Sequence, residues 1–428
     1  MYFERLLYGL LTTLVIGTQL AACGSVAVQD EVQLTPAADG HWNAGYRLAY
    51  PATGITLVRT PNDARSRRWH AVSPDFEIVQ IDKKDMVRRK DGAPFSVVDI
   101  IVPATYVPLP KDYAPFAPFS DGGLLIHSGR YQWCPTTAVE ADGACDGPWL
   151  MQITPPNEAH ILLNGERHTR ATKWLDSNDG TYVYVGTAKP NQSRNFIGIV
   201  DPALPTGIAQ IMSDLLPQLM EQYAQELPPL RHRPMLFISY DPSFSNGRGN
   251  QGGTLPGQVF MHFYGPGWVE SEADGFTPED TAWFFAHEVG HLFQHDVSGE
   301  LEATWIHEGA AEAFAYLILK SLAAVSEEYL TSRRERAFDR CRDALQRGTL
   351  ATAAARAQFS DYYECGLIMF LAIDTAIRTS SADQQDLFSF WRSLIADTGS
   401  GELWQNDGFL DNAQQVIGLS LTERLRSL

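Results

Sequence analysis

Residues 287–291, with the sequence H-E-V-G-H, constrain the fold of this chain more than any other segment. On an α-helix, residues four apart are separated by about 400° of rotation and about 6 Å of rise, so His287 and His291 project from one face about one turn apart. One metal ion can then accept both imidazoles. Glu288 lies about 100° around the helix from His287, where its carboxylate can act as general base on a water at the metal. The spacing therefore predicts two metal ligands and a base on one helix.

The residues around this segment indicate that it does lie on a helix. Thr277, Pro278 and Asp280 follow the order of a helix start, with a hydroxyl at the N-cap, proline in first position and an acidic group in the first turn. Apolar residues then recur at helical spacing, at Ala282, Phe285, Ala286, Val289 and Phe293. A helix with such a stripe packs against a core. The alternative is an amphipathic helix whose histidines only happen to stack on one face.

A second helix is expected to open near Thr304, and it places Glu308 in its first turns. A catalytic zinc ion usually has three protein ligands and leaves a fourth position for water. We therefore expect one Zn²⁺ per chain, held by His287, His291 and Glu308. Glu312, one turn beyond Glu308, would accept the second N–H of a ligand histidine, or would be a solvated helix carboxylate.

These two segments resemble those of the gluzincin metallopeptidases, particularly the M1 and M61 aminopeptidase families. In those families H-E-x-x-H is followed by a helix with W-x-x-E-G, and residues 305–309, W-I-H-E-G, match that motif. The glutamate of the motif is the family's third zinc ligand, which implies the same role for Glu308. The resemblance further implies zinc-dependent hydrolysis of peptide bonds, with a peptide or protein as substrate.

The same letters exclude the metzincins, another zinc family. Metzincins extend the motif with a glycine and a third histidine, and Gln294 and Val297 occupy those positions here. His295 lies one turn past His291 and could be mistaken for a ligand. Because Glu308 already completes a set of three ligands, we expect His295 at the helix end or the rim of the site.

Residues 363–366, Y-E-C-G, resemble the Y-E-K-G segment that opens a later helix in M1 enzymes. The tyrosine of that segment donates to the oxyanion of the reaction, which implies this role for Tyr363, with Tyr362 as the alternative. An ordinary interface tyrosine is the other interpretation. Cys365 stands where the family has lysine.

Residues 247–252 spell G-x-G-x-x-G, but a strand rather than a helix is expected after this loop, which argues against a dinucleotide site. The loop lies where M1 aminopeptidases have G-x-M-E-N, whose glutamate binds the substrate α-amine. Residues 252–256, G-G-T-L-P, contain no glutamate. The choice between aminopeptidase and endopeptidase therefore stays open. The following strand, 258–264, could pair with an extended peptide, with His262 as a contact near the cleft.

The N-terminus is expected to be a targeting segment. Arg5 precedes an apolar run at 6–16 that is too short to span a bilayer comfortably, and residues 20–23, L-A-A-C, resemble the bacterial lipobox. The resemblance implies cleavage before Cys23, lipid attachment to its thiol, and anchoring in the bacterial cell envelope. Gly24 favours the outer membrane, facing periplasm or exterior. An ordinary signal peptide and a buried helix are the alternatives.

Four cysteines follow the lipobox cysteine. Local pairing in an oxidising compartment gives Cys134–Cys145 and Cys341–Cys365, which is one of the three connectivities that four cysteines allow. No C-x-x-C is present, which argues against zinc binding by these residues.

Composition and patterning predict an α+β chain. Residues 1–22 would be the signal peptide and 23–40 a linker; 41–205, with short β-type runs between turn residues, would form a β-sandwich-like domain. Residues 206–428, mainly helical after a few strands, would form a thermolysin-like zinc catalytic domain. The net charge of −18 argues against nucleic acid as a partner. Two other functions stay open: a binding or adhesion lipoprotein with structural zinc, and a gluzincin that hydrolyses a non-peptide substrate.

Overall fold

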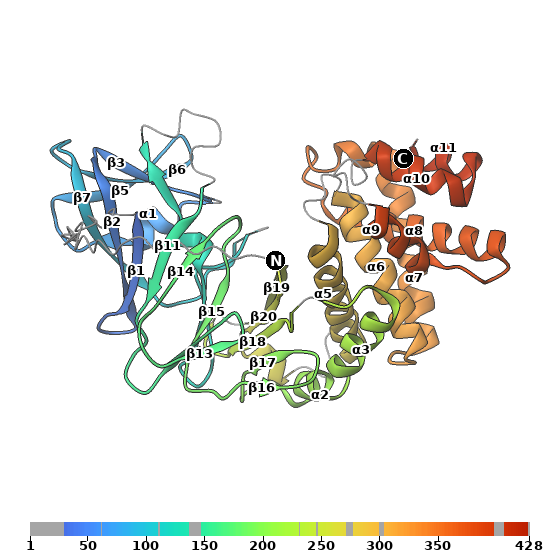
Figure 1. Cartoon of the computed structure of the whole chain (residues 1–428), viewed down its shortest axis with the longest axis horizontal. Coiled ribbons are helices and arrows are strands. Elements are labelled where there is room, and N and C mark those ends of the chain that lie inside the picture. Colours follow the sequence, from blue (N-terminus) through green and yellow to red (C-terminus); the bar gives the residue numbers. More distant parts are fainter. Residues whose placement is uncertain are drawn as a thin grey trace, which may run out of the picture.

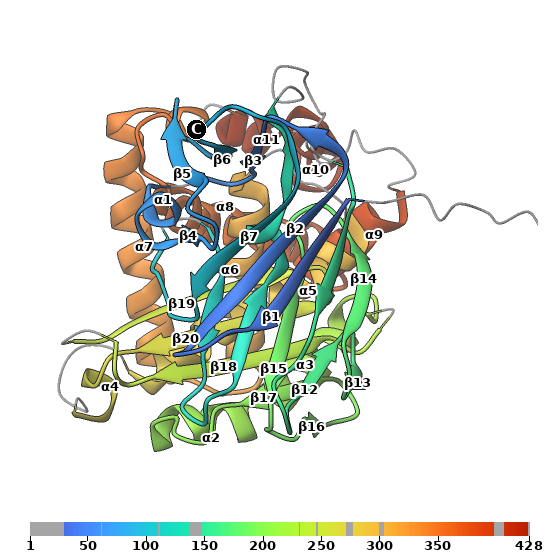
Figure 2. The same ribbon diagram turned by 90° about the vertical axis from the view of Figure 1, so that its left-hand side faces the viewer.

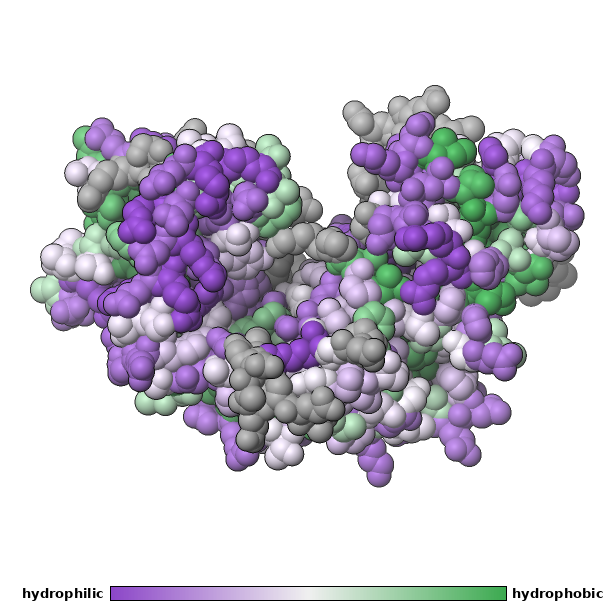
Figure 3. All heavy atoms as spheres, turned by 180° about the vertical axis from the view of Figure 1, so that it is seen from behind, coloured by the Kyte–Doolittle hydropathy of each residue, from purple (hydrophilic) through white to green (hydrophobic). Residues whose placement is uncertain are grey.

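The computed structural model is mixed α+β, with a lobe of strands and a lobe of helices joined at one end (Figure 1). The structure describes residues 30–60, 62–109, 112–136, 147–230, 232–244, 247–270, 277–298, 304–397 and 406–426. Seen from behind, the surface is hollowed between the two lobes (Figure 3). Among the described residues, no helix combines the length and the apolar character needed to cross a membrane.

Three sheets form the strand lobe. The largest has the order β14 (Thr172–Asp176), β11 (Trp149–Ile153), β1 (Glu31–Pro36), β2 (His41–Ala52), β7 (Phe95–Pro103), β4 (His70–Ala71), and Figure 2 looks onto it. The second has the order β10 (Trp133–Pro135), β3 (Gly54–Leu57), β6 (Lys84–Arg89), β5 (Phe76–Ile81). The third has the order β13 (Glu166–His168), β12 (His160–Leu163), β15 (Tyr182–Gly186), β9 (Leu124–His127), β8 (Phe116–Pro118). Helix α1 (Ala64–Arg68) and a 3₁₀ turn at Ser128–Tyr131 connect strands of this lobe.

Strand β1 lies inside the segment that the sequence predicted to be a linker. Val32 and Leu34 alternate with polar neighbours and are fully buried, and β1 pairs with both β2 and β11. The prediction of a linker up to residue 40 was therefore wrong from Glu31 onward. Residues 31–35 do show the alternation of a half-buried strand, but the small and polar residues on both sides led to its assignment to the linker.

A fourth sheet joins the two lobes. Its order is β16 (Asn191–Gln192), β17 (Ile197–Val200), β18 (Met235–Asp241), β20 (Gln258–Tyr264), β19 (Gly249–Leu255), so β19 is an edge strand. Strand β19 contains most of the stretch predicted as a glycine-rich loop, which corrects that prediction. Its seven residues pair antiparallel with β20 along their whole length. Pairing with a strongly apolar neighbour compensates for the low strand propensity of glycine.

The helical lobe follows. Its helices are α2 (Thr206–Asp214), α3 (Leu216–Glu226), α4 (Gly267–Glu270), α5 (Pro278–Ser298), α6 (Thr304–Ser321), α7 (Glu327–Arg347), α8 (Ser360–Ser381), α9 (Leu387–Asp397), α10 (Asn406–Ile417) and α11 (Leu419–Arg426), with a 3₁₀ turn at Leu350–Thr352. Helix α5 begins as predicted: the backbone N–H of Asp280 donates to Oγ1 of Thr277 at 3.1 Å, and the N–H of Thr277 donates to the Asp280 carboxylate at 2.9 Å. These bonds satisfy donors that a helix start leaves open.

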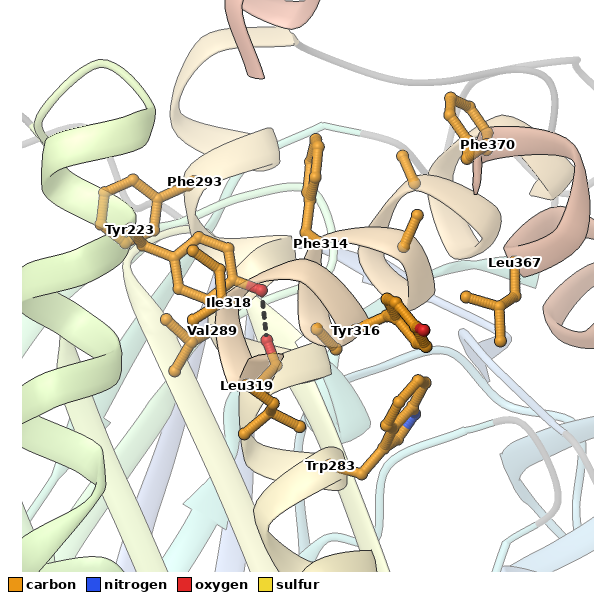
Figure 4. Close-up of a cluster of buried hydrophobic side chains, with 14 of the residues drawn as sticks. Tyr223, Trp283, Val289, Phe293, Phe314, Tyr316, Ile318, Leu319, Leu367 and Phe370 are labelled. Carbon is orange, nitrogen blue, oxygen red and sulfur yellow. Dashed lines mark hydrogen bonds between the residues drawn. The ribbon is translucent and has the colours of Figure 1, made fainter. Parts of the chain in front are cut away.

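The predicted apolar stripe of α5 is buried in the core of the helical lobe. Val289 and Phe293 lie beside Tyr223 of α3 and side chains of α6, and the same core continues across α6 to Leu367 and Phe370 of α8 (Figure 4). The Tyr223 hydroxyl donates to the carbonyl oxygen of Ala286 at 2.8 Å, which ties α3 to the middle of α5. The opposite face of α5 is left for the cleft between the lobes. The helix is therefore held rigidly at the point where its histidines lie.

Candidate metal centre

Helices α5 and α6 bring the three predicted ligands together. The Nε2 atoms of His287 and His291 are 2.9 Å apart, and Oε2 of Glu308 lies 3.3 Å from the first and 3.1 Å from the second. All three side chains are largely buried, and they line a cleft of about 760 Å³ between the lobes. Among the described residues, this is the group of histidine, cysteine and acidic side chains that could hold a metal ion.

The geometry fits a zinc ion. Zinc bonds to nitrogen and oxygen are about 2.0–2.2 Å long, so the ligand atoms of a tetrahedral site lie about 3.3 Å from one another. The three distances here, 2.9, 3.1 and 3.3 Å, are within a few tenths of an ångström of that value. Two imidazole nitrogens and a carboxylate oxygen that face one common point are also a donor set typical of a catalytic zinc site. His287, His291 and Glu308 therefore fit the zinc ion that the sequence implies.

Glu312 lies behind His287, as the sequence predicted for a carboxylate one turn beyond Glu308. Its Oε1 is 3.0 Å from Nδ1 of His287, and its two oxygens also accept from Nε1 of Trp283 at 3.1 and 3.2 Å. Burial opposes protonation of His287, but hydrogen bonds to Glu308 and Glu312 outweigh it and raise its pKa to about 10. The position of Glu312 beside Nδ1 favours a proton on that nitrogen, so Nε2, which faces His291 and Glu308, is the nitrogen that would bind a metal.

Gln294 has the matching role for His291, and sequence reasoning missed it. Its Oε1 lies 2.8 Å from Nδ1 of His291, and its Nε2 donates to the carbonyl oxygen of His307 at 3.2 Å. The side chain is completely buried. The signal was its position three residues after His291, which is one helical turn away on the same face. The ring of His307 stacks on that of His291, with centroids 4.1 Å apart.

Thr254 of the edge strand β19 contacts the predicted base. Its Oγ1 donates to Oε2 of Glu288 at 2.9 Å, and both side chains are buried. Sequence analysis singled out this stretch only for its missing glutamate. Thr254 and Glu288 are 34 residues apart, so the contact depends on how β19 packs against α5. One carboxylate oxygen of Glu288 is thereby fixed.

Tyr363 of α8 lies beside the ligand cluster. Its ring stacks on His287 with centroids 5.7 Å apart, its hydroxyl hydrogen-bonds Glu308, and it lines the cleft. Burial, followed by the negative charge of Glu308, raises its pKa far above the ordinary value. Tyr362, the alternative, is buried; its hydroxyl accepts from the backbone N–H of Ala354, and it is not among the residues that line the cleft.

Two glycines explain why the helices carrying Glu308 and Tyr363 come so close. A Cβ added to Gly309 would lie 2.5 Å from Cα of Gly366, so α6 and α8 cross backbone to backbone at this point. Both glycines belong to the motifs at residues 305–309 and 363–366. A larger residue at either position would separate Glu308 from Tyr363.

Other predicted residues have different outcomes. His262 is completely buried, with Nδ1 2.7 Å from the hydroxyl oxygen of Ser239, so its prediction as a substrate contact was wrong. It faces the strand lobe beneath Tyr106, because side chains alternate between the two faces of β20. The disulfide between Cys341 and Cys365 is confirmed. Cys23, Cys145 and the side chain of His295 lie outside the part that the structure describes.

Comparison with known proteins supports the fold. No protein-family model and no curated protein matches the sequence. The structure is similar to that of an aminopeptidase N family protein from Idiomarina loihiensis, with a TM-score of 0.63 and 14% identity, over 93% of this chain and 75% of that one. It also matches an M1 zinc metallopeptidase from Deinococcus radiodurans with a TM-score of 0.48 and 14% identity, over 93% and 92% of the two chains. The first likeness shows a shared fold, and the expected mixed α+β class is confirmed.

Proposed function

We propose that this chain is a zinc-dependent peptidase of the gluzincin type. The observation that carries the proposal is the convergence of His287, His291 and Glu308 on one point of a cleft, with Glu288 beside them. The similarity of the fold to an aminopeptidase N family protein supports it. In this proposal the strand lobe is the β-sandwich-like domain, and residues 206–428 form a thermolysin-like catalytic domain.

The residues divide the chemistry among them. His287, His291 and Glu308 would hold zinc, which would supply a Lewis acid for the scissile carbonyl and for a water molecule. The carboxylate of Glu288 takes the proton of the attacking water and passes it to the leaving amine. Thr254 holds Oε2 of this carboxylate and leaves Oε1 for the water. Tyr363 stays protonated, because its pKa is raised, and donates to the oxyanion that develops on the substrate.

Strand β19 would bind the substrate as an extended peptide. One edge of β19 pairs with β20, and residues 251–254 line the cleft. A peptide can add to such an edge through backbone hydrogen bonds, which requires no particular substrate sequence. The α-amine-binding glutamate of M1 aminopeptidases has no counterpart in residues 252–256. Peptide substrates with free and with blocked N-termini must therefore be compared to distinguish an aminopeptidase from an endopeptidase.

A peptide library tests the proposal. Wild-type protein and Glu288→Gln are incubated with the same library, made once with free and once with acetylated N-termini, and the products are mapped by mass spectrometry. We expect cleavage by the wild type only, with zinc retained in both proteins. Acetylation abolishes the cleavage if the enzyme is an aminopeptidase and leaves it unchanged if it is an endopeptidase.

The other candidate functions give different results in the same assay. A binding lipoprotein with structural zinc would contain the metal but cleave no peptide. A hydrolase of non-peptide substrates would also leave the library intact, yet would hydrolyse activated esters in a zinc-dependent manner. Cleavage of equal rate by wild type and Glu288→Gln would refute the mechanism.

We propose further that the protein is exported and anchored by lipid at Cys23, in the bacterial outer membrane facing periplasm or exterior. The lipobox-like residues 20–23 support this. In a bacterial host given radiolabelled palmitate, wild type should incorporate label and fractionate with membranes. Cys23→Ala should do neither, and label in that variant would contradict the proposal.

A further inference from the structure

Behind the proposed zinc ligand His287, a row of charged side chains runs from Glu312 to Arg333, both of which also line the cleft, and on to Glu364. Glu312 contacts Nδ1 of His287, and Nη2 of Arg333 on α7 lies 2.8 Å from Oε2 of Glu312. The other guanidinium nitrogen, Nη1, is 3.5 Å from Oε2 of Glu364 on α8. The guanidinium carbon is also 4.9 Å from the ring centroid of Trp283, the residue that donates to Glu312.

Arg333 balances two buried carboxylates at once. Glu312 and Glu364 are 4% and 6% exposed, and the Arg333 side chain between them is 17% exposed. Buried carboxylates are costly without a partner, and removing one member of such a group leaves the others uncompensated. Since guanidinium presents its donors in a fixed fork, it also fixes the plane of the carboxylate it contacts. The orientation of Glu312 therefore depends on Arg333.

A covalent link holds Arg333 and Glu364 at this separation. The disulfide joins Cys341 of α7 to Cys365 of α8, with their Cα atoms 4.7 Å apart. Cys365 directly follows Glu364 in the chain, and Nη1 of Arg340, which directly precedes Cys341, lies 2.7 Å from Oε1 of Glu364. The disulfide and this ion pair thus clamp α7 to α8 where Glu364 meets Arg333.

We propose that Arg333, held by Glu364 across the disulfide-linked α7 and α8, is a positioning residue for His287. It fixes the Glu312 carboxylate, which in turn holds the imidazole in the tautomer and orientation that present Nε2 to zinc. The inference rests on the proposed function only in so far as His287 binds metal. Its consequence is that retention of zinc depends on side chains that never touch the ion.

The test measures zinc affinity by competition with a chromophoric chelator, and it needs no peptide substrate. Groups that contact a metal ligand typically contribute about 10–100-fold to metal affinity, and because Arg333 acts through one such group, Glu312, Arg333→Gln should weaken zinc binding by up to about that factor. Arg333→Lys, which keeps the charge but not the fork, should recover part of it. Arg342→Gln is the matched control, because Arg342 is an exposed arginine of the same helix paired with Asp339 and Asp343.

Two further variants test the clamp. Glu364→Gln should also lower the zinc affinity. The double variant with Arg333→Gln should bind zinc only slightly more weakly than either single variant, since both changes break the same row of contacts. Cys341→Ser with Cys365→Ser should also lower zinc affinity. Circular dichroism and thermal unfolding of each zinc-loaded variant separate this effect from general loss of the fold.

The outcomes distinguish this inference from the proposed function. If Arg333→Gln and Arg342→Gln have the same zinc affinity, whether unchanged or lowered, the positioning role of Arg333 is overturned, even if the wild type cleaves peptides. A selective loss in Arg333→Gln supports it even if no peptide is cleaved. A wild type that binds no zinc overturns both.

Discussion

Histidines are buried in two parts of this molecule under opposite electrostatic conditions. His262 on β20 is completely buried, its Nδ1 contacts the Ser239 hydroxyl, and burial lowers its pKa to about 3. His287 on α5 is 6% exposed, and carboxylates 3.0 and 3.3 Å from its two ring nitrogens raise its pKa. Only the second histidine borders the cleft. Burial of a histidine therefore does not define a site, whereas carboxylates that converge on it at a cleft do.

The largest expected effect on zinc content and activity follows from removing a proposed zinc ligand beside His287, compared with removing the buried His262. His291→Ala leaves His287 and Glu308 as the remaining ligands, so we expect loss of zinc and of all peptide cleavage above the uncatalysed rate. Metal content is measured by plasma mass spectrometry after gel filtration. His262→Gln is the control and should keep full zinc and full activity. Cleavage by zinc-free His291→Ala would break the comparison.

Tyr363→Phe should have the next largest effect. Removing one donor to a developing oxyanion costs about 10²–10³ in kcat, because the donor acts in the transition state more than in the ground state. Steady-state kinetics with one good peptide should show lower kcat with little change in KM and unchanged zinc content. Tyr362→Phe provides the matched control, since its hydroxyl bonds a backbone N–H away from the cleft. An equal loss in both variants would assign Tyr363 a structural role.

Thr254→Val, which acts through the proposed base Glu288, should lower activity less than Tyr363→Phe does. Valine keeps the shape of threonine but removes the hydrogen bond to Oε2 of Glu288. A hydrogen bond to a charged group contributes about 1.5–3 kcal/mol, equivalent to about 10–150-fold in kcat/KM. Thr254→Ser keeps the hydroxyl and should recover most of the activity. If serine and valine are equally impaired, packing rather than the hydrogen bond is responsible.

The smallest effect on activity should appear at His262, whose change should be seen only in stability. Its pKa is about 3 in the folded protein against 6.5 for a free histidine, so the unfolded chain binds a proton that the folded one does not between these values. This contribution to stability is complete above pH 6.5 and is lost as pH falls toward 3, at about 1.4 kcal/mol per pH unit. Urea unfolding at pH 6 and pH 4 should show a steeper loss for wild type than for His262→Gln. An equal loss of unfolding free energy between pH 6 and pH 4 in both proteins would contradict a lowered pKa for His262.

The sequence predicted those parts of the site that lie along single helices. His287, Glu288 and His291 follow from helical spacing, and the start of α5 follows from its capping residues. Glu308 and Glu312 lie one turn apart on α6, so their spacing also carried information. The helix with Tyr363 was predicted to open at residues 363–366 from the resemblance to the M1 motif, and it begins three residues earlier, at Ser360.

The missed residues make contacts between segments distant in sequence. Thr254 reaches Glu288 from an edge strand, and Arg333 reaches Glu312 from another helix, 21 residues away. No spacing rule links such pairs, because their meeting depends on how whole elements pack. Strands β1 and β19 were missed for a related reason. Strand β19 is rich in glycine and β1 has only two buried apolar residues, and long-range pairing stabilises both.

The most direct test of the account is a zinc titration of chelator-stripped protein, with peptide cleavage as the measurement. For the wild type, we expect activity to rise in proportion to added zinc and to level off at one equivalent per chain. Glu288→Gln should bind the same single equivalent of zinc, but its cleavage rate should stay about 10²–10⁴-fold below that of the wild type. Full activity of the stripped protein without zinc, or equal activity of Glu288→Gln at one equivalent, would contradict a zinc peptidase with Glu288 as its base.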